Sequence, residues 1–278
     1  MAYKDLLVHM DNGRSAKSRL DIAVKLAADN DAHLTGLYVM TRPHVPQFIQ
    51  AHIGEEVLEA QRSAIIAGSK KAEELFISTC EREGIKYEWR SIEDDLFEGI
   101  RLHTRYADLA ILGQYDPENS IGEGADSLVD RLVLSAGRPV LVIPYVGEYP
   151  TMGSRAMVAW DGGRLAARAI NDAIPLIQNA KMVEVLAINP KAGNDQHGDI
   201  PGADICLHLA RHGINADAEH IISPDVDPGN LLLSRAADQS IDLIVMGAYG
   251  HRRLRELVLG GMTHHILKHM TVPVLMDH

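Results

Sequence analysis

Four glycines and a threonine follow an apolar run near the C-terminal end of the chain. The run ends at Met246, and the residues after it include Gly247, Gly250, Gly260, Gly261 and Thr263. Glycine leaves backbone N–H groups unshielded, because it has no Cβ, and it reaches positive φ without strain. A helix that begins just after such a loop adds unpaired N–H groups and the positive end of its dipole. The spacing therefore predicts a phosphate site, with its helix over residues 262–270.

The common phosphate and hydrolase motifs do not account for these glycines. The GxxxxGK[ST] pattern of P-loop ATPases is absent, and no GxGxxG pattern follows either of the expected first strands. The absence of GxSxG also weighs against a serine hydrolase of the α/β type. The pattern that remains is G-x2-G-x9-G-G-x-T.

Composition narrows the class of protein. The 278 residues include 46% hydrophobic residues and carry a formal net charge of −11. This acidity disfavours nucleic-acid binding, and the cluster of Arg252, Arg253 and Arg255 is too short to reverse it. Cys80 and Cys206 form no CxxC pair, no apolar run is long enough to cross a bilayer, and the N-terminus lacks a signal-peptide pattern. We expect a cytoplasmic protein that binds no membrane.

The chain repeats itself. Aligning residues 107–115 with 241–249 places Asp108 on Asp242 and Gly113 on Gly247, and the same offset carries Pro139 onto Pro273. At the start of each copy, residues 5–11 resemble 155–161, with Asp11 on Asp161. We therefore predict two tandem domains, over 1–147 and 152–278, joined through a segment rich in Gly and Pro. Asp242 begins its strand at the end away from the predicted site and is expected to be structural.

Alternating elements predict the same architecture in both copies. In the first copy we expect strands over 5–10, 33–39, 85–92, 109–113 and 139–144, and helices over 15–30, 55–83, 95–106 and 127–137. In the second copy we expect strands over 156–161, 182–188, 215–222, 242–247 and 273–276, and a short middle helix near 201–212. This order predicts an α/β protein with two tandem doubly wound, mostly parallel five-stranded sheets. Ligands of such sheets bind beyond the carboxyl ends of the strands, so Asp161-Gly162 and Gly247 should border a pocket.

The glycine motif, the aspartate after the first strand and the closing Pro-Val-Leu strand resemble the universal stress protein family in its tandem two-domain form. The resemblance covers nearly the whole chain through both repeats. It implies a Rossmann-like fold of the universal stress protein and adenine nucleotide alpha hydrolase-like type. It also implies that the second copy binds ATP or a related adenine nucleotide (AMP or ADP), with or without Mg²⁺, in a stress-response or regulatory role rather than as an efficient enzyme.

The resemblance also assigns roles to residues. Asp161 would contact the nucleoside, Ala159 would line the adenine side, and Ala187 would touch adenine through its backbone. Met246 and Gly247 would flank the ribose and base, and the phosphates would be surrounded by Gly250, Gly260, Gly261, Met262 and Thr263. One departure is Gly261, where ATP-binding members carry Ser or Thr. A lost hydrogen bond to a charged group is worth about 1.5–3 kcal/mol, or roughly one to two orders of magnitude in affinity.

The first copy departs further from the motif. Gly250 aligns with Asp116 and Gly260 with Asp126, so two carboxylates are expected to face the place where phosphates would lie, which disfavours binding. The acidic segment 116–126 has no balancing base within it, and we expect a solvated loop there. An alternative is a metal or cation site built on Asp116, Glu118, Glu123 and Asp126.

Other candidate side chains give weaker signals. His264, His265 and His269 are expected to be solvated or capping residues, although His265 and His269 share the spacing of a metal pair. Trp160 either stacks on a base or packs against the sheet. No positioned general base accompanies the motif, so we name no catalytic residue and expect at most slow ATP hydrolysis.

Two further functions stay open. One is a ligand-free protein-interaction scaffold, and the other is a slow ATP hydrolase or adenylyl-transfer relative. The strands over 139–144 and 273–276 are expected to pair within one molecule, which would satisfy two exposed edges. A homodimer and an unknown protein partner are also compatible with the sequence.

Overall fold

A computed structural model describes residues 2–41, 54–118, 125–190, 200–249 and 261–278. The first unit contains β1 (Asp5–Met10), α1 (Ala16–Asn30), β2 (His33–Met40), α3 (Glu55–Glu83), β3 (Lys86–Glu93), α4 (Leu96–Thr104), β4 (Leu109–Gly113), the 3₁₀ turn η1 (Ala125–Ser127), α5 (Leu128–Ser135) and β5 (Val140–Ile143). The second contains β6 (Arg155–Ala159), α6 (Arg164–Ile177), β7 (Met182–Ile188), α7 (Ala203–Arg211), β8 (Asp217–Ile221), α8 (Pro228–Asp238), β9 (Leu243–Gly247), α9 (Gly261–His269) and β10 (Val274–Asp277). The expected alternation of strands and helices is confirmed.

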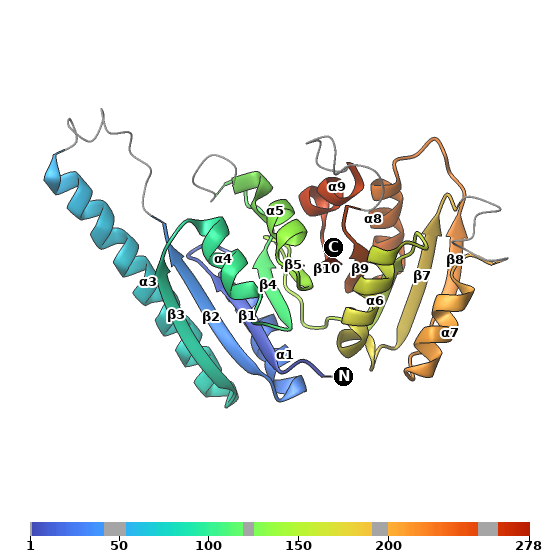
Figure 1. Cartoon of the computed structure of the whole chain (residues 1–278), viewed down its shortest axis with the longest axis horizontal. Coiled ribbons are helices and arrows are strands. Elements are labelled where there is room, and N and C mark those ends of the chain that lie inside the picture. Colours follow the sequence, from blue (N-terminus) through green and yellow to red (C-terminus); the bar gives the residue numbers. More distant parts are fainter. Residues whose placement is uncertain (1, 42–53, 119–124, 191–199, 250–260) are drawn as a thin grey trace.

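The ten strands of the described residues belong to one sheet (Figure 1). Their order is β3-β2-β1-β4-β5-β10-β9-β6-β7-β8, and every neighbouring pair is parallel except β5 and β10. Val142 faces Val274 and Leu141 faces Leu275 in this antiparallel pair. The intramolecular pairing of the two closing strands is thus confirmed, and the two expected five-stranded sheets are joined into one because each closing strand satisfies the other's open edge.

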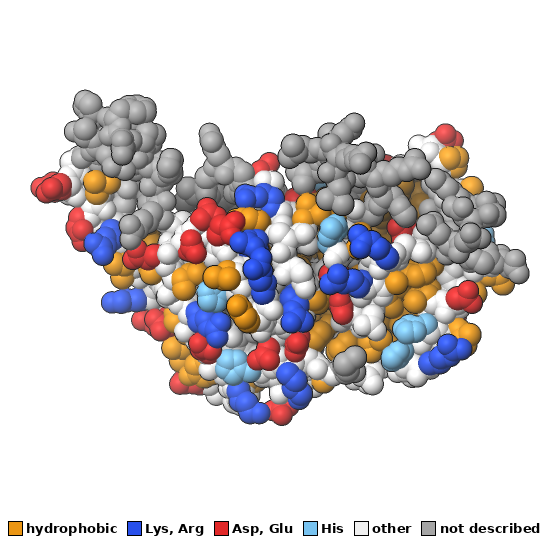
Figure 2. All heavy atoms as spheres, viewed as in Figure 1, with side chains coloured by type: hydrophobic (Ala, Val, Ile, Leu, Met, Phe, Trp, Pro, Cys, Tyr) orange, Lys and Arg blue, Asp and Glu red, His pale blue; other side chains and the backbone are white. Residues whose placement is uncertain are grey.

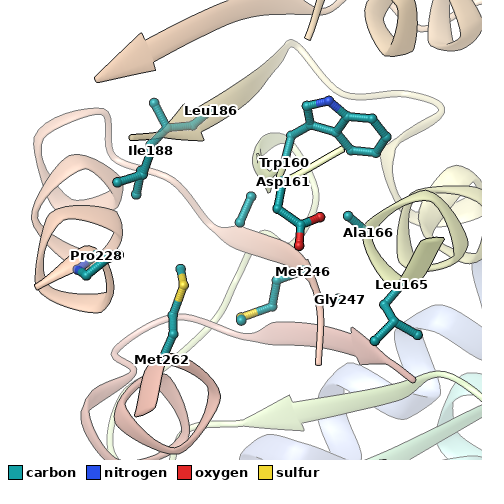
Figure 3. Close-up of a pocket in the computed structure, with 11 residues that line it drawn as sticks. Trp160, Asp161, Leu165, Ala166, Leu186, Ile188, Pro228, Met246, Gly247 and Met262 are labelled. Atoms are coloured by element: carbon teal, nitrogen blue, oxygen red, sulfur yellow. The ribbon is translucent and has the colours of Figure 1, made fainter. Parts of the chain in front are cut away.

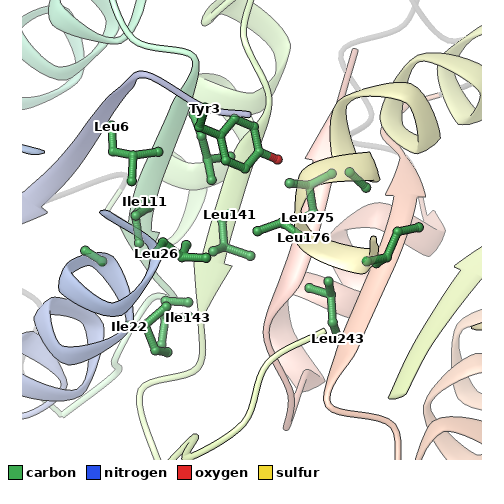
Figure 4. Close-up of a cluster of buried hydrophobic side chains, with 14 of the residues drawn as sticks. Tyr3, Leu6, Ile22, Leu26, Ile111, Leu141, Ile143, Leu176, Leu243 and Leu275 are labelled. Atoms are coloured by element: carbon green, nitrogen blue, oxygen red, sulfur yellow. The ribbon is translucent and has the colours of Figure 1, made fainter. Parts of the chain in front are cut away.

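Two helical layers cover the sheet. The helices α1, α3, α6 and α7 contribute to one buried cluster, and α4, α5, α8 and α9 contribute to the other. Successive residues of β1 alternate between the clusters, since Leu6 and Val8 belong to the first and Leu7 to the second. The first cluster crosses the junction between the units, where Leu141 lies near Leu275 and Leu176 (Figure 4).

The aligned aspartates play the same structural part in both units. The Asp108 carboxylate accepts hydrogen bonds from the backbone N–H groups of Lys4 and Asp5, at 2.7 and 3.1 Å. Asp242 accepts from Ser154 and Arg155 at 3.2 and 2.9 Å. Each aspartate therefore secures the start of the neighbouring strand, β1 or β6, at the end of the sheet away from the predicted site, as expected for Asp242.

A pair of carboxyl groups, from Asp172 on α6 and Asp277 on β10, lies at the junction. The Tyr3 hydroxyl donates a 2.6 Å hydrogen bond to the Asp172 carbonyl oxygen, and the Asp277 side chain is buried. Burial, a hydrogen bond with Asp277 and the charge of that residue raise the pKa of Asp172 from 3.8 to about 7. The native state therefore keeps a proton that the unfolded chain releases at lower pH.

Replacing Asp172 with Asn is expected to flatten the pH dependence of stability. Because the folded-state pKa is raised, the wild-type free energy of unfolding should fall as the pH rises from about 4 through 7. The Asp172→Asn variant cannot release this proton and should keep its stability over that window. Urea unfolding between pH 4 and pH 8 measures the effect, with Asp21→Asn on the exposed face of α1 as the control. An equal loss of stability in wild type and Asp172→Asn would contradict the raised pKa of Asp172.

Candidate nucleotide site

A cavity of about 230 Å³ lies beyond the carboxyl ends of β6 and β9 (Figure 3). These two strands are neighbours at the point where the chain order of the second unit reverses, which is where α/β sheets bind ligands. The cavity is lined by Ala159, Trp160, Asp161, Leu165, Ala166, Leu186, Ile188, Pro228, Met246, Gly247 and Met262. Its walls are mainly apolar, and Asp161 supplies the one carboxylate among these lining residues.

Five of the predicted site residues line this cavity: Ala159, Asp161, Met246, Gly247 and Met262. Gly261 is exposed at the first residue of α9. Thr263 is buried, and its hydroxyl oxygen accepts a 3.2 Å hydrogen bond from the backbone N–H of Tyr249. Gly250 and Gly260 lie outside the described residues.

Ala187 is not among the residues that line the cavity. Its neighbours on β7, Leu186 and Ile188, line it instead. Side chains alternate between the two faces of a strand, so these two point to one side of the sheet and Ala187 to the other. The sequence analysis also missed Leu165, Ala166 and Pro228, which come from the first turns of α6 and α8. These three residues could have been predicted, because the helices that follow the strands begin beside the strand ends.

The turn after β6 holds Asp161 in place. β6 ends at Ala159, so Trp160 and Asp161 lie just beyond the strand rather than within it. One Asp161 carboxylate oxygen accepts a 2.8 Å hydrogen bond from the Gly163 N–H, and the side chain extends toward Met246 and Gly247 (Figure 3). Trp160 packs against the core cluster that includes α6 while also bordering the cavity.

Two helices begin at the cavity without acidic residues in their first turns. Leu165 and Ala166 lie in the first turn of α6, and Met262 lies in the first turn of α9. Neither helix has Asp or Glu there to offset the partial positive charge of its N-terminus. This arrangement favours an anion near the cavity.

The two described motif glycines serve different purposes. A Cβ on Gly247 would come within 2.6 Å of the Ala166 nitrogen and of the Leu165 carbonyl carbon, so the close approach of α6 requires glycine there. A Cβ on Gly261 would meet no heavy atom within 4 Å. Packing therefore fixes Gly247 but leaves room for a larger residue at Gly261.

The corresponding space in the first unit is filled by the chain itself. The alignment that places Asp11 on Asp161 also places His9 on Ala159 and Arg19 on Ala169. Arg19 is buried, donates from Nε to the His9 carbonyl oxygen at 2.7 Å, and pairs with an Asp11 carboxylate oxygen at 2.8 Å. A Cβ on Gly113 would overlap the Arg19 guanidinium.

The expectation that the acidic segment lacks a balancing base was wrong. Asp116 is buried and pairs with Arg14 at 2.9 Å, and Arg14 also holds Glu118 at 2.9 Å. The acidic segment thus has a balancing base, which comes from the turn before α1. Beside Gly113, the residue that aligns with Gly247, the first unit carries the buried Arg19 guanidinium, and Asp116 is held by Arg14.

Burial also affects the ionisation of the first unit's residues. Burial lowers the pKa of His9 to about 4, so its imidazole is neutral near pH 7. Burial alone would raise the pKa of Asp11, but the charge of Arg19 and the hydrogen bonds from Gly13 and Arg19 outweigh it and lower the pKa below its usual range.

The structure gives no support to the metal alternatives. Among the described residues, no three His, Cys, Asp or Glu side chains come together in a way that could hold a metal ion. The rings of His265 and His269 are tilted by 46° with their centroids 4.6 Å apart, and a ring nitrogen of His265 lies 3.0 Å from the Asn230 side-chain oxygen. Glu123, named in the cation alternative, lies outside the described residues.

Acidic and basic side chains are mixed on the molecular surface. Over the part of the face occupied by α4 and α5, Lys, Arg, Asp and Glu lie side by side (Figure 2). In the described segments, no helix combines the length and apolar character needed to span a membrane.

The fold and the cavity define a doubly wound α/β protein with a ligand-sized hollow at the strand ends. Residues 152–278 match the family model described as the universal stress protein family. Residues 152–278 make up a little under half of the chain, and this second unit is similar to the universal stress protein family.

Curated relatives carry the same family name. A universal stress protein of Synechocystis is 24% identical over 169 residues, which cover 60% of this chain and 57% of that protein. A universal stress protein of Methanocaldococcus jannaschii is 35% identical over 48 residues, which cover 17% of this chain and 30% of that protein. The matched part of the chain therefore spans just over half the length of the first relative and less than a third of the second.

Solved structures share the fold of both units. A universal stress protein from Archaeoglobus fulgidus has a TM-score of 0.72 at 15% identity and covers 98% of this chain and 97% of its own. A functionally unknown protein from Pseudomonas aeruginosa has a TM-score of 0.63 at 17% identity and covers 99% of this chain and 92% of its own. At these identities the likeness establishes the fold.

Proposed function

We propose that the C-terminal unit, residues 152–278, binds ATP or a related adenine nucleotide, and that the chain acts as a stress-response or regulatory binding protein. The observation that carries this proposal is the cavity between β6 and β9, bordered by Asp161 and by the first turns of α6 and α9. The apolar walls suit a planar purine, and the Asp161 carboxylate can accept hydrogen bonds from ribose hydroxyls. The start of α9 at Gly261 suits the phosphates.

The lining residues favour binding over efficient catalysis. Asp161 is the titratable carboxylate at the cavity, and one of its oxygens is already engaged by the Gly163 N–H. Efficient hydrolysis needs a base oriented toward a bound water by a partner group. We therefore expect ATP hydrolysis to be slow and incidental.

Calorimetric titration of the purified chain with ATP, with and without Mg²⁺, tests this function. We expect saturable binding, together with adenine nucleotide detected by native mass spectrometry in the protein as purified. A ligand-free interaction scaffold would instead show no heat and no shift in melting temperature at millimolar ATP. That result would refute nucleotide binding.

Gly261→Ser is expected to tighten ATP binding. The side chain would enter open space, and its hydroxyl lies at the start of α9, where the family's ATP-binding members carry Ser or Thr. One hydrogen bond to a charged phosphate is worth about 1.5–3 kcal/mol, so the Kd should fall by about 10-fold or more. Calorimetry compares this variant with Gly261→Ala, which lacks the hydroxyl. Equal affinities for the two variants would show that no phosphate lies at this residue.

Assembly and location are part of the same proposal. We propose a cytoplasmic homodimer with a protein partner still to be found. Because β5 and β10 satisfy each other's edges, a second copy would use an outer edge at β3 or β8, or a helical face. Sedimentation equilibrium tests the dimer, since a monomer mass over micromolar concentrations would exclude it.

A further inference from the structure

We propose that Asp130, in the first unit, is a positioning residue for the nucleotide site of the second unit. This inference rests on the proposed function, because it concerns how that same site is held in shape. Asp130 acts through Tyr249, which follows β9 and immediately precedes the motif residue Gly250 in the sequence. The unit that has lost its own site would thereby shape the site of the other.

Tyr249 is held at both of its ends. Its backbone N–H donates to the Thr263 hydroxyl oxygen on α9 at 3.2 Å, and its phenol hydroxyl donates to an Asp130 carboxylate oxygen on α5. Its φ is +57°, which is an uncommon conformation for a residue other than glycine. Such a conformation persists only where surrounding contacts maintain it. The hydroxyl–carboxylate bond is the contact that reaches across the junction.

Within the part of the chain that the structure describes, the partners of the Asp130 side chain, Tyr249 and His264, belong to the second unit. The Asp130 side chain is 2% exposed, and a buried carboxylate is costly unless it is paired and hydrogen-bonded. The Tyr249 hydroxyl supplies one donor, and the His264 Nδ1 atom lies 3.4 Å from the same carboxylate oxygen. Burial and the nearby carboxylate raise the pKa of Tyr249, which keeps the phenol protonated as a donor.

A second contact fixes the far end of α9. The Gln114 side-chain amide donates to the Leu267 and Lys268 carbonyl oxygens, at 2.9 and 3.2 Å. Its oxygen accepts from the Tyr145 N–H at 3.2 Å, so Gln114 is itself anchored in the first unit. The first unit therefore holds the C-terminal end of the helix whose N-terminal end begins at the cavity.

The cross-junction bond works in one direction. In the repeat alignment Tyr249 corresponds to Tyr115, and Asp130 corresponds to His264, which is not a carboxylate. Tyr115 therefore has no carboxylate at position 264 to which it could donate the equivalent hydrogen bond. A cavity of about 400 Å³, lined in part by Asp130, Tyr115 and His264, borders the contact. The Tyr249 ring also packs against the hydrophobic cluster on this face of the sheet, and the bond to Asp130 adds to that packing in setting the position of the ring.

Three variants test the inference: Tyr249→Phe, Asp130→Ala and Asp130→Asn. We expect Tyr249→Phe and Asp130→Ala each to weaken ATP binding about tenfold, as loss of a hydrogen bond to a charged group would. A variant with both Tyr249→Phe and Asp130→Ala should bind ATP no more weakly than Asp130→Ala alone, because the two changes break the same hydrogen bond. Asp130→Asn keeps an acceptor oxygen and should bind with intermediate affinity. Asp126→Asn, on the neighbouring 3₁₀ turn, is the control and should match the wild type.

Amide hydrogen exchange gives a second readout without any nucleotide. Exchange of the Tyr249 amide should accelerate at least tenfold in Tyr249→Phe and Asp130→Ala, while the amides of the distant strand β3 keep their wild-type rates. Unchanged exchange at Tyr249, or equal acceleration throughout the sheet, would overturn the positioning role. Failure of the wild type to bind ATP would refute the proposed function, and the exchange result would then decide the positioning role by itself.

Discussion

Ala159→His is expected to abolish ATP binding by the C-terminal unit while leaving the fold intact. Ala159 lines the cavity at the end of β6, and the corresponding residue of the first unit is His9. His9 is buried and lies 3.9 Å from Asp11, so the first unit shows that this fold accepts an imidazole beside that aspartate. In the second unit the imidazole would take the space we assign to adenine. We expect at least about a 100-fold loss of affinity, or about 2.7 kcal/mol.

Calorimetry with ATP and a melting curve of the free protein together check this expectation. Ala159→Ser is the matched control, because it keeps the cavity open and should bind as the wild type does. A melting temperature close to wild type shows that Ala159→His is folded. If that folded variant bound ATP with wild-type affinity, the nucleotide base would not occupy the cavity between β6 and β9.

Arg19→Ala should cause the largest loss of stability among the variants considered. The guanidinium is 1% exposed, donates to the His9 carbonyl oxygen and pairs with Asp11. Breaking a buried ion pair costs about 3–5 kcal/mol, and because the Asp11 side chain remains 41% exposed we expect the lower end, about 3 kcal/mol. Lys17→Ala removes an exposed pair with Asp21 on the same helix and should cost about 0.5 kcal/mol or less.

The cost of Arg19→Ala should also depend on pH. Because the folded-state pKa of Asp11 is lowered, the stability from its ionised form is complete above the ordinary pKa of aspartate. This stability is lost as the pH falls through the lowered pKa of Asp11. Urea unfolding should therefore show a larger difference between wild type and variant at pH 7 than at pH 3. A loss below about 1 kcal/mol at pH 7 would mean that Arg19 does not hold the first unit's site together.

The sequence predicted where the cavity lies, but it did not predict the structural role of every residue that borders it. Asp161 and Gly247 were expected at the pocket because both follow strands that end at one edge of the sheet, and both line the cavity. Gly247 was expected to expose its amide, yet the close approach of α6 is what excludes a side chain there. Ala187 was expected to touch adenine through its backbone; it does not line the cavity, whereas its neighbours Leu186 and Ile188 do, and the backbone contact stays a prediction.

Contacts between segments that are far apart in the chain were not predicted from the sequence. Arg14 and Asp116 are 102 residues apart, and no local pattern indicates that the turn before α1 pairs with a carboxylate just after β4. Tyr249 and Asp130 are 119 residues apart and belong to different units. Each pair meets only because the strand order brings the two segments to the same end of the sheet.

The repeat, the order of strands and helices, the glycine motif and the pairing of the two closing strands could be predicted from the sequence, because periodicity and residue spacing are local properties of the chain and unpaired strand edges are unfavourable. The contacts of Arg19 with His9 and Asp11, and the contact of Asp130 with Tyr249, became evident only in the folded structure. These features depend on which buried groups come within a few ångströms of each other. Such distances are set by how the packed layers meet, and neighbours in the sequence carry no record of them.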